Sequence, residues 1–291
     1  MTMRIREVPL EELASVKDSE WTDPNRRPFV YGKTAYVPVR EGCSSDGSLG
    51  QYQRYRGRGY HMIGPIAVVR GEQPTSDEVQ QIIEWQRPQG VVWVPSHSGV
   101  CRIPSSQVLY GSSGDVLHRE SGIFFLLDPT KVMFSQGNRT EKERIAGLTR
   151  EGERVADMYA GIGYFTLPVA RAGGLVHAME INPVAFGYLQ KNILINKLSD
   201  RIEVSCGDCR DLLAGEYDRV IMGHFDSSGA LSRVLPHVHP GSVIHIHSSG
   251  QHPTDLGHQL KAAGFEAEIE TRAVKKTAPH CWHYVQDVRL A

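Results

Sequence analysis

The chain has 291 residues, of which 40% are hydrophobic and 22% are charged, and its formal net charge is −1. This length can bury a sizeable core and suggests two domains, and the composition is that of an ordinary globular protein. The near-zero net charge excludes nucleic-acid binding through global charge, so any such binding depends on local basic patches.

The sequence carries no signal for a membrane or for secretion. No apolar stretch approaches the roughly 20 residues that a membrane helix needs, and the first residues, MTMRIREVPLEEL, are interrupted by charges. The cysteines are scattered and odd in number, unlike a disulfide framework: Cys43, Cys101, Cys206, Cys209 and Cys281. We therefore expect a cytoplasmic protein with reduced thiols.

Residues 1–120 are rich in loop signals and are expected to form a small N-terminal α+β domain. Loop-forming stretches such as TDPNRRP and EGCSSDGSLG separate short apolar runs. YHMIGPIAVVR and VVWVPS have the pattern of helical or strand fragments, and SDEVQQIIEWQR between them has a helical one. We expect this domain to contact the substrate.

Residues 121–291 alternate between strand and helix patterns. The strand candidates are RVADMYA, LVHAMEI, RIEVSCG, YDRVIMG and GSVIHIHS, and the helical stretches include NPVAFGYLQKNILINKL and PTDLGHQLKAAG. This alternation predicts an α/β fold with a doubly wound, largely parallel sheet. FEAEIETRAVK and WHYVQDVRLA have no helix between them, so the sheet is expected to end in an antiparallel hairpin, as in class I methyltransferases.

The stretch DMYAGIGYFTLP, residues 157–168, is typical of a strand, a tight turn and a helix. Ligands of open α/β sheets bind at the carboxyl ends of the strands, and Gly161 and Gly163 would let the backbone approach one. Two glycines in such a turn also occur for packing alone.

Two acids strengthen a binding interpretation. Glu180 ends the second strand candidate, where a carboxylate accepts hydrogen bonds from ribose hydroxyls. Asp208 follows the third strand candidate, where its carboxylate can accept a hydrogen bond from the adenine amine. Either acid alone could be a loop or capping residue. Thr166 stands where a nicotinamide fingerprint needs its third glycine, so S-adenosylmethionine fits better than NAD.

Two basic clusters are candidates for RNA contact. The first, QYQRYRGRGYH, interleaves arginines with tyrosines, which suit phosphate pairing and base stacking: Arg54, Arg56 and Arg58 with Tyr52, Tyr55 and Tyr60. The second comprises Arg272, Lys275 and Lys276. Both could equally be solvated loops. The Cys206–Cys209 spacing lacks the second ligand pair of a structural zinc site, so no metal is expected.

Several of these segments together resemble one known family: LDPTKVMFSQGNRTEKERI, DMYAGIGYFTLPVA, MEINPVAFGYLQKNILINKLSDRIEVSCGDCRDL, DRVIMG and KKTAPHCWHYVQDVRL. They resemble the tRNA guanosine-37 modification family, which contains N1-methyltransferases and aminocarboxypropyltransferases of the wybutosine pathway. The resemblance covers residues 120–291 and extends weakly to HMIGPIAVVRGE. It implies S-adenosylmethionine as the group donor.

The segment after the fourth strand distinguishes the two branches. The methyltransferases carry an Asn-Leu-Pro-like motif there, whereas this chain has GHFDSS from Gly223 to Ser228. GSVIHIHSS, with His245 and His247, and the Trp282–His283 pair resemble the aminocarboxypropyltransferases, although the two histidines of GSVIHIHSS could simply fill the sheet surface. The resemblance thus implies transfer of the 3-amino-3-carboxypropyl group to C7 of 4-demethylwyosine in the anticodon loop of tRNA-Phe.

The resemblance also implies roles for individual residues. Ser135 and Lys142 would contact S-adenosylmethionine, Glu180 its ribose, and Asp208 with the Cys209 backbone its adenine. His224 and Asp226 lie nearest the expected reaction centre, where they could be catalytic or could cap the next helix. We expect a monomer. Two alternatives stay open: the N1-methyltransferase, and a noncatalytic RNA-binding module, against which the intact Glu180 and Asp208 argue.

Overall fold

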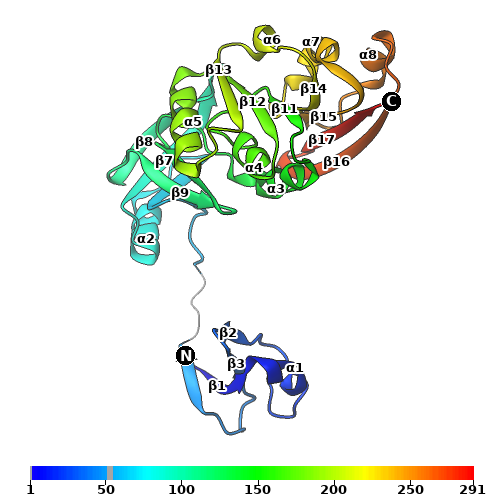
Figure 1. Cartoon of the computed structure of the whole chain (residues 1–291). Coiled ribbons are helices and arrows are strands. Elements are labelled where there is room, and N and C mark those ends of the chain that lie inside the picture. Colours follow the sequence, from blue (N-terminus) through cyan, green and yellow to red (C-terminus); the bar gives the residue numbers. More distant parts are fainter. Residues whose placement is uncertain (1, 51–54) are drawn as a thin grey trace. The chain divides into compact units, whose positions relative to one another are not determined.

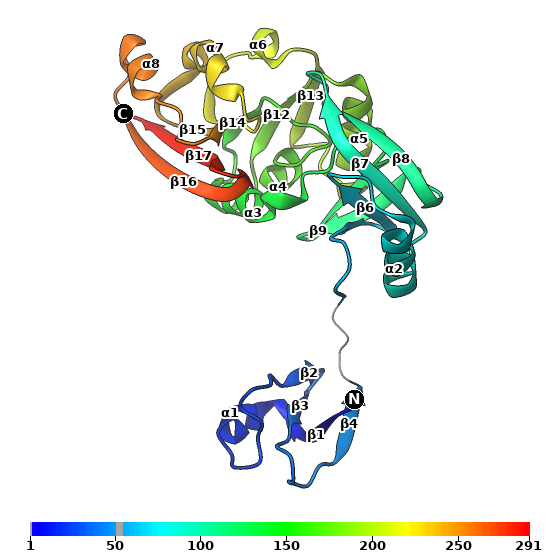
Figure 2. The same cartoon turned by 180° about the vertical axis from the view of Figure 1, so that it is seen from behind.

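The computed structural model describes residues 2–50 and 55–291, which form two compact units. One unit extends to Arg56, and the other runs from Gly57 to Ala291. Figures 1 and 2 show the elements of each unit from opposite sides. Each helix among the described residues is too short or too polar to cross a lipid bilayer.

The N-terminal unit is a four-stranded antiparallel sheet with the order β2-β3-β1-β4. A short α1 (Leu13–Val16) follows the first strand, and Val8, Ala35 and Val37 form a small core against it. The strands are β1 (Thr2–Pro9), β2 (Phe29–Tyr31), β3 (Thr34–Pro38) and β4 (Gly47–Gly50). Alternation of buried and part-exposed residues along β3 leaves one face of this sheet apolar.

The second unit begins with a four-stranded sheet, β5-β6-β7-β8, followed by the hairpin β9–β10. Helix α2 (Ser76–Gln86) connects the parallel pair β6 and β7, and a capping box between Thr75 and Glu78 fixes its first turn. The strands are β5 (His61–Ile63), β6 (Ile66–Arg70), β7 (Gly90–Ser98), β8 (Ile103–Gly111), β9 (Val116–Glu120) and β10 (Ile123–Leu127).

The expected domain boundary at residue 120 does not coincide with the division into compact units. Ile66 and Val92 of the smaller sheet belong to the same buried cluster as Phe125 of β10 and Leu167 of α4 (Thr166–Arg171). Because this core is continuous, residues 57–120 pack as part of the larger unit. A separate role for residues 1–120 in substrate contact stays a prediction.

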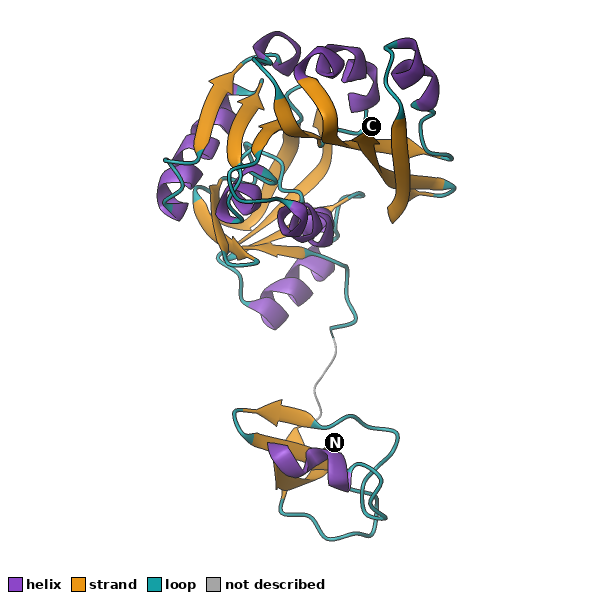
Figure 3. Cartoon of the chain, turned by 45° about the vertical axis from the view of Figure 1, so that its right-hand side comes forward, coloured by secondary structure: helices purple, strands orange, loops and turns teal. Residues whose placement is uncertain are grey.

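The centre of the larger unit is a seven-stranded sheet with the order β13-β12-β11-β14-β15-β17-β16. Figure 3 distinguishes strands, helices and loops by colour. Its strands are β11 (Arg154–Asp157), β12 (Leu175–Glu180), β13 (Ile202–Cys206), β14 (Tyr217–Met222), β15 (Val238–Gly250), β16 (Ala267–Ala278) and β17 (Cys281–Leu290). The helices are α3 (Arg139–Leu148), α4 (Thr166–Arg171), α5 (Pro183–Asn196), α6 (Cys209–Leu212), α7 (Leu231–Val234) and α8 (Gly257–Ala262). Short 3₁₀ turns are η1 (Leu10–Glu12), η2 (Gln136–Asn138), η3 (Ser227–Ala230) and η4 (Leu235–His237).

The predicted doubly wound fold is confirmed. Strands β11 to β15 pair in parallel, and β15–β17 and β16–β17 pair antiparallel, so the sheet ends in a hairpin. One apolar cluster joins α3, α4 and α5 to the sheet, and a second joins α7 and α8 to its other face. This arrangement is that of the class I methyltransferase fold, with the carboxyl ends of the parallel strands along one edge.

Candidate active site

A cavity of about 430 Å³ lies at the carboxyl ends of four parallel strands. Gly161, Glu180, Asp208 and Gly223 line it, and each lies at or just after the carboxyl end of a different strand: β11, β12, β13 and β14. The alternation of strands and helices brings these four positions together, because all four strands point the same way. The structure thus gathers the glycine turn and both predicted acids around one cavity.

The glycine turn and Glu180 are connected by hydrogen bonds. The backbone N–H of Gly161 donates to Oε2 of Glu180 over 2.7 Å, and the backbone N–H of Asn182 donates to Oε1 over 2.7 Å. Gly161 has a φ of +58°, and a Cβ there would come within 2.5 Å of the Tyr164 ring. Burial raises the pKa of Glu180, and the hydrogen bonds from these backbone donors partly offset that rise. Each carboxylate oxygen keeps a lone pair for a ribose hydroxyl.

Thr166 has a role in this turn that a glycine could not fill. Its hydroxyl donates to Oδ2 of Asp157 over 2.6 Å, at the carboxyl end of β11. Asp157 is fully buried, and this burial raises its pKa to about 6. The position that departs from the nicotinamide fingerprint therefore holds together the strand and the helix that flank the turn.

Asp208 lies at the cavity rim as the N-cap of α6, where its carboxylate accepts from the backbone N–H of Arg210 over 3.0 Å. The Arg210 guanidinium pairs with the same carboxylate and holds the pKa of Asp208 at about 2. Cys209 is buried beside it, and burial raises the pKa of its thiol to about 11. The capping role and the adenine-binding role are compatible, because the carboxylate has several lone pairs.

Ser135 lines the cavity, but Lys142 does not. The Lys142 ammonium is buried, donates to Oε1 of Glu120 over 2.8 Å and lies above the rings of Phe134 and Tyr164, each 5.2 Å from its centroid. Burial lowers its pKa, and Glu120 acts against this. A cofactor contact by Lys142 stays a prediction, and in this structure its ammonium is used by Glu120.

His224 and Asp226 border a second cavity of about 360 Å³ that adjoins the first. The backbone N–H of Asp226 donates to Nδ1 of His224 over 3.2 Å, so the neutral ring carries its proton on Nε2. Burial, then Arg102, lowers the pKa of His224. The Asp226 side chain is 92% exposed, so its carboxylate retains ordinary hydration. Their catalytic roles stay predictions.

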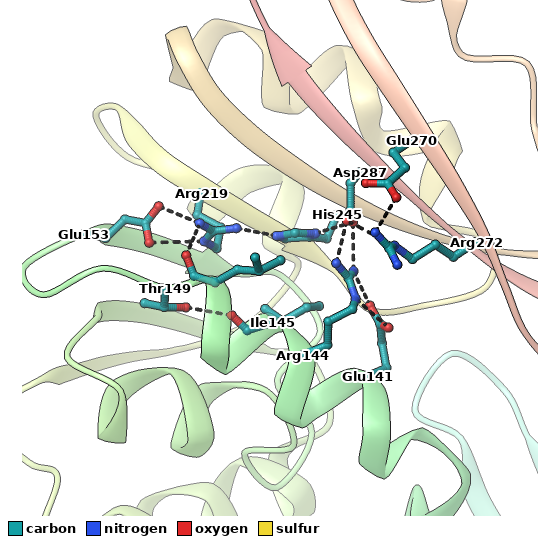
Figure 4. A network of polar contacts seen from close by, with 11 residues as sticks. Glu141, Arg144, Ile145, Thr149, Glu153, Arg219, His245, Glu270, Arg272 and Asp287 are labelled. Atoms are coloured by element: carbon teal, nitrogen blue, oxygen red, sulfur yellow. Dashed lines mark hydrogen bonds and ion pairs between the residues drawn. The ribbon is translucent and has the colours of Figure 1, made fainter.

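His245 belongs to a polar network away from that cavity (Figure 4). Arg219 donates to its Nε2 over 2.6 Å, and its Nδ1–H donates to Oδ1 of Asp287 over 2.6 Å. Arg144 bridges Asp287 to Glu141. Because guanidinium can only donate, His245 is a neutral imidazole with both nitrogens occupied. In this structure His245 fills the sheet surface, which was the second of the two interpretations of this histidine in the sequence.

His247 points from the same face of β15 toward β17, where its Nδ1 lies 3.0 Å from Nε2 of His283. Both rings are buried, and His247 packs edge-on against Phe165 with ring centroids 5.3 Å apart. Burial lowers the pKa of His247 well below its usual range. The pair thus supports Phe165, which lines the cavity.

The predicted RNA clusters have mixed outcomes. Arg54 lies outside the described residues, and Arg56 is exposed. Arg58 instead donates to the carbonyls of Arg70 and Glu72 and pairs with Glu78, so its guanidinium is largely used within the fold. In the second cluster, Lys276 is exposed, and Lys275 donates to Oδ1 of Asn138 over 2.9 Å. RNA binding by these clusters stays a prediction.

Two residues of the site were missed in the sequence. Asn182 caps α5 and donates from Nδ2 to the Cys101 carbonyl over 3.0 Å, which joins the β7–β8 loop to the end of β12. The Asn-Pro pair at a helix start was the available signal. Arg102, in that loop, lines both cavities and had no local signal.

Comparison with known proteins agrees with this geometry. The model of the TRM5/TYW2 methyltransferase domain matches residues 116–271. A Methanocaldococcus jannaschii protein named tRNA(Phe) (4-demethylwyosine(37)-C(7)) aminocarboxypropyltransferase is 35% identical over 244 residues, which cover 79% of this chain and 97% of that protein.

Two solved structures are also similar. M. jannaschii TYW2 in complex with AdoMet is 31% identical, with a TM-score of 0.66, over 80% of this chain and 99% of that one. Trm5b from Pyrococcus abyssi is 26% identical, with a TM-score of 0.75, over 100% of both chains. The family match spans more than half of the chain, and the relative's sequence is matched almost throughout. The chain belongs to the TRM5/TYW2 family of S-adenosylmethionine-dependent tRNA-modifying transferases.

Proposed function

We propose that this protein transfers the 3-amino-3-carboxypropyl group of S-adenosylmethionine to C7 of 4-demethylwyosine at position 37 of tRNA-Phe. The observation that carries the proposal is the cavity at the strand ends, where Glu180 and Asp208 suit an adenosine, combined with 35% identity to a relative of that name. The GHFDSS segment, which replaces Asn-Leu-Pro, supports the same branch.

The reaction forms a bond between C7 of the base and Cγ of the methionine part, and it breaks the Cγ–S bond. The sulfonium, once bound, supplies the leaving group, methylthioadenosine, and the C7 proton leaves to a base or to water. The contribution of the protein is mainly to hold the donor and the base in line. Glu180 and Asp208 fix the adenosine end, so the reacting end faces the adjoining cavity bordered by His224 and Asp226.

His224 is suited to orient the acceptor base. Its Nδ1 accepts a backbone N–H, so the Nε2–H of the neutral ring is the donor that remains. The Tyr159 ring lies beside it, with centroids 5.4 Å apart. Together they offer a flat, partly apolar surface and one hydrogen-bond donor to a tricyclic base.

One observation favours a second candidate, the tRNA guanosine-37 N1-methyltransferase. The Trm5b structure covers the whole chain, whereas the TYW2 structure covers 80% of it. The higher sequence identities are nevertheless with the aminocarboxypropyltransferases, at 35% and 31% against 26%. We therefore place methyl transfer second.

The test is incubation of the protein with S-adenosylmethionine and tRNA-Phe that carries 4-demethylwyosine. Mass spectrometry of the digested tRNA and chromatography of the nucleoside by-product are then read together. A gain of the aminocarboxypropyl mass with methylthioadenosine supports the proposal. A methyl gain with S-adenosylhomocysteine supports the second candidate, and unmodified tRNA with bound donor contradicts both.

The finer parts of the proposal are the anticodon loop as the binding site, a monomeric state and a cytoplasmic location. Footprinting of tRNA-Phe, light scattering of the purified protein and cell fractionation test them in that order. No metal takes part in the proposed step, and activity after treatment with a chelator tests this.

A further inference from the structure

The loop between β7 and β8 brings an arginine to the cofactor cavity. Arg102 has a φ of +49°, and its backbone N–H donates to the Gly99 carbonyl over 3.1 Å, which closes a tight turn. The preceding Cys101 carbonyl accepts from Asn182 Nδ2 over 3.0 Å. The loop is thereby fastened beside the strand end that carries Glu180.

The guanidinium of Arg102 has no acidic partner among the residues that the structure describes. Within residues 2–50 and 55–291, the only hydrogen-bond partner of this guanidinium is the sulfur of Met133, 3.7 Å from Nη2, and its Nε is buried with no partner there. A buried donor without a partner is costly, and a thioether is a weak acceptor. The head group is therefore available to an anion that binds in the cavity.

The other charges of this cavity indicate which anion fits. Glu180 and Asp208 lie at the end that suits adenosine, and Arg210, the second arginine of the lining, is paired with Asp208. The methionine part of the donor carries an α-carboxylate, which prefers a guanidinium partner. Arg102 is the arginine of the described lining that no carboxylate neutralises.

Arg102 also lies at the junction of the two cavities. Arg102, His224 and Asp226 line both the cofactor cavity and the adjoining cavity. Its charge acts on the two histidines that border the adjoining cavity. After burial, Arg102 is the next cause that lowers the pKa of His224. Burial, then Arg70, then Arg102 lower the pKa of His97 to about 4. A carboxylate held here would place the methionine arm, rather than the methyl group, at the junction.

We propose that Arg102 binds the α-carboxylate of S-adenosylmethionine and thereby selects the aminocarboxypropyl arm for transfer. The inference deepens the proposed function and rests on it. Arg102 is a binding residue that affects product choice by positioning the donor. Because it holds the carboxylate end of the arm, Cγ is turned toward the base. A phosphate of the tRNA backbone is the other anion that a guanidinium could take at this place.

The experiment is a binding cycle that uses three nucleosides and needs no catalysis. Calorimetry measures the affinity of the wild type and of Arg102→Gln for S-adenosylmethionine, for its decarboxylated analogue and for methylthioadenosine. We expect Arg102→Gln to weaken S-adenosylmethionine binding about 10- to 100-fold, as for a lost charge-assisted hydrogen bond. Binding of the decarboxylated analogue and of methylthioadenosine should change by less than about twofold, because neither carries the carboxylate.

Arg210→Gln is the matched control, because it removes an arginine from the adenosine end of the same cavity. It should change the affinities for all three nucleosides by one common factor. Arg102→Lys keeps the charge without the planar fork and should recover part of the lost affinity. Glutamine and lysine both retain a side chain at the left-handed φ, so the turn bears the same backbone cost in each variant.

Three outcomes overturn the inference. Equal losses for all three nucleosides in Arg102→Gln would show that Arg102 shapes the cavity rather than binding the carboxylate. Unchanged S-adenosylmethionine affinity with weakened, salt-dependent tRNA binding would assign Arg102 to a phosphate. Unchanged binding of both S-adenosylmethionine and tRNA would show that Arg102 binds neither. If the wild type fails to modify tRNA but the cycle gives the expected pattern, only the proposed function fails.

A product readout then connects binding to selection. With wild-type activity established, Arg102→Gln should raise the ratio of S-adenosylhomocysteine to methylthioadenosine, because the arm is no longer held at the junction. An unchanged ratio together with weakened donor binding would contradict the selecting role and retain the binding one.

Discussion

The backbone N–H of Gly161 lies 2.7 Å from Oε2 of Glu180, so the turn after β11 and the acid that ends β12 form one hydrogen-bonded unit. The second carboxylate oxygen is held by the backbone of Asn182, whose side chain reaches the β7–β8 loop. Glu180 therefore presents its remaining lone pairs in a fixed direction. The turn after β11 and the start of α5 meet at this carboxylate, and the Asn182 side chain joins the β7–β8 loop to them.

Replacement of Glu180 by alanine is expected to weaken the binding of S-adenosylmethionine and of methylthioadenosine equally, by about tenfold or more, because both molecules carry the ribose. It should also lower the free energy of unfolding by about 1–3 kcal/mol, since two backbone donors lose their acceptor. Calorimetry and urea unfolding measure the two effects. Unchanged affinity in a variant with a native circular dichroism spectrum would remove Glu180 from the site.

The network in Figure 4 predicts a specific dependence of stability on pH. Burial alone would raise the pKa of Asp287, but hydrogen bonds from His245 and Arg144 outweigh it and hold that pKa well below its usual range. A carboxyl with a lower pKa in the folded state stabilises the fold above its unfolded pKa, about 3.9, and this stability is lost as the pH falls further. Urea unfolding of the wild type between pH 7 and pH 3 should show the onset of this loss, which continues at lower pH because the folded pKa is lower still.

Asp287→Asn should reduce that loss of stability at low pH, and at pH 7 it should cost about 3 kcal/mol or more, because Arg144 loses a buried partner. Glu270→Gln is the matched control on the same hairpin. Glu270 pairs with Arg272, and both side chains are exposed, at 61% and 44%, so little change is expected. Equal effects of the two substitutions would show that the buried network contributes no more than a surface ion pair.

Parts of this site could be predicted from the sequence because each depends on a local pattern. Gly161, Glu180 and Asp208 each follow an apolar strand pattern, and parallel strands bring their carboxyl ends together. The terminal hairpin was predicted by the lack of a helix between two strand patterns. Such features need only short-range regularity and the rules of sheet topology.

The remaining features depend on contacts between distant residues. Lys142 has the pattern of a solvated helix charge, yet it pairs with Glu120 of β9 inside an aromatic cluster. Arg58 stands in an arginine-rich stretch, and it is the fold of residues 70–78 that occupies its donors. Arg102 lines the cavity from the β7–β8 loop, where the carbonyl of the preceding Cys101 accepts from the distant Asn182. No spacing in the sequence encodes these tertiary neighbours.

The Lys142–Glu120 pair can be separated from a cofactor contact by a double-mutant cycle. Both side chains are at least nine-tenths buried, so Lys142→Met should destabilise the fold by about 3–5 kcal/mol by leaving Glu120 unpaired. Adding Glu120→Gln should recover part of that loss. Lys131→Met, which breaks a pair with a 58% exposed lysine, is the control and should cost less than about 1 kcal/mol.

The same variants test the cofactor role through donor affinity. If the Lys142 ammonium serves only Glu120, the folded double variant should bind S-adenosylmethionine within about twofold of the wild type. A loss of affinity in the double variant, with stability recovered, would instead assign Lys142 to the donor, as the family resemblance implies.

The two arginines at positions 56 and 58 should respond differently to substitution. Arg56 is exposed, so Arg56→Gln should weaken tRNA binding and reduce the slope of log affinity against log salt by about 1, with an unchanged melting temperature. Arg58 donates to two backbone carbonyls, so the main effect of Arg58→Gln should be a lower melting temperature. Fluorescence anisotropy with labelled tRNA-Phe at several salt concentrations, beside thermal unfolding, distinguishes them. Identical salt slopes for the wild type and Arg56→Gln would exclude a phosphate contact at that position, because a phosphate paired with a cation must release counterions when it binds.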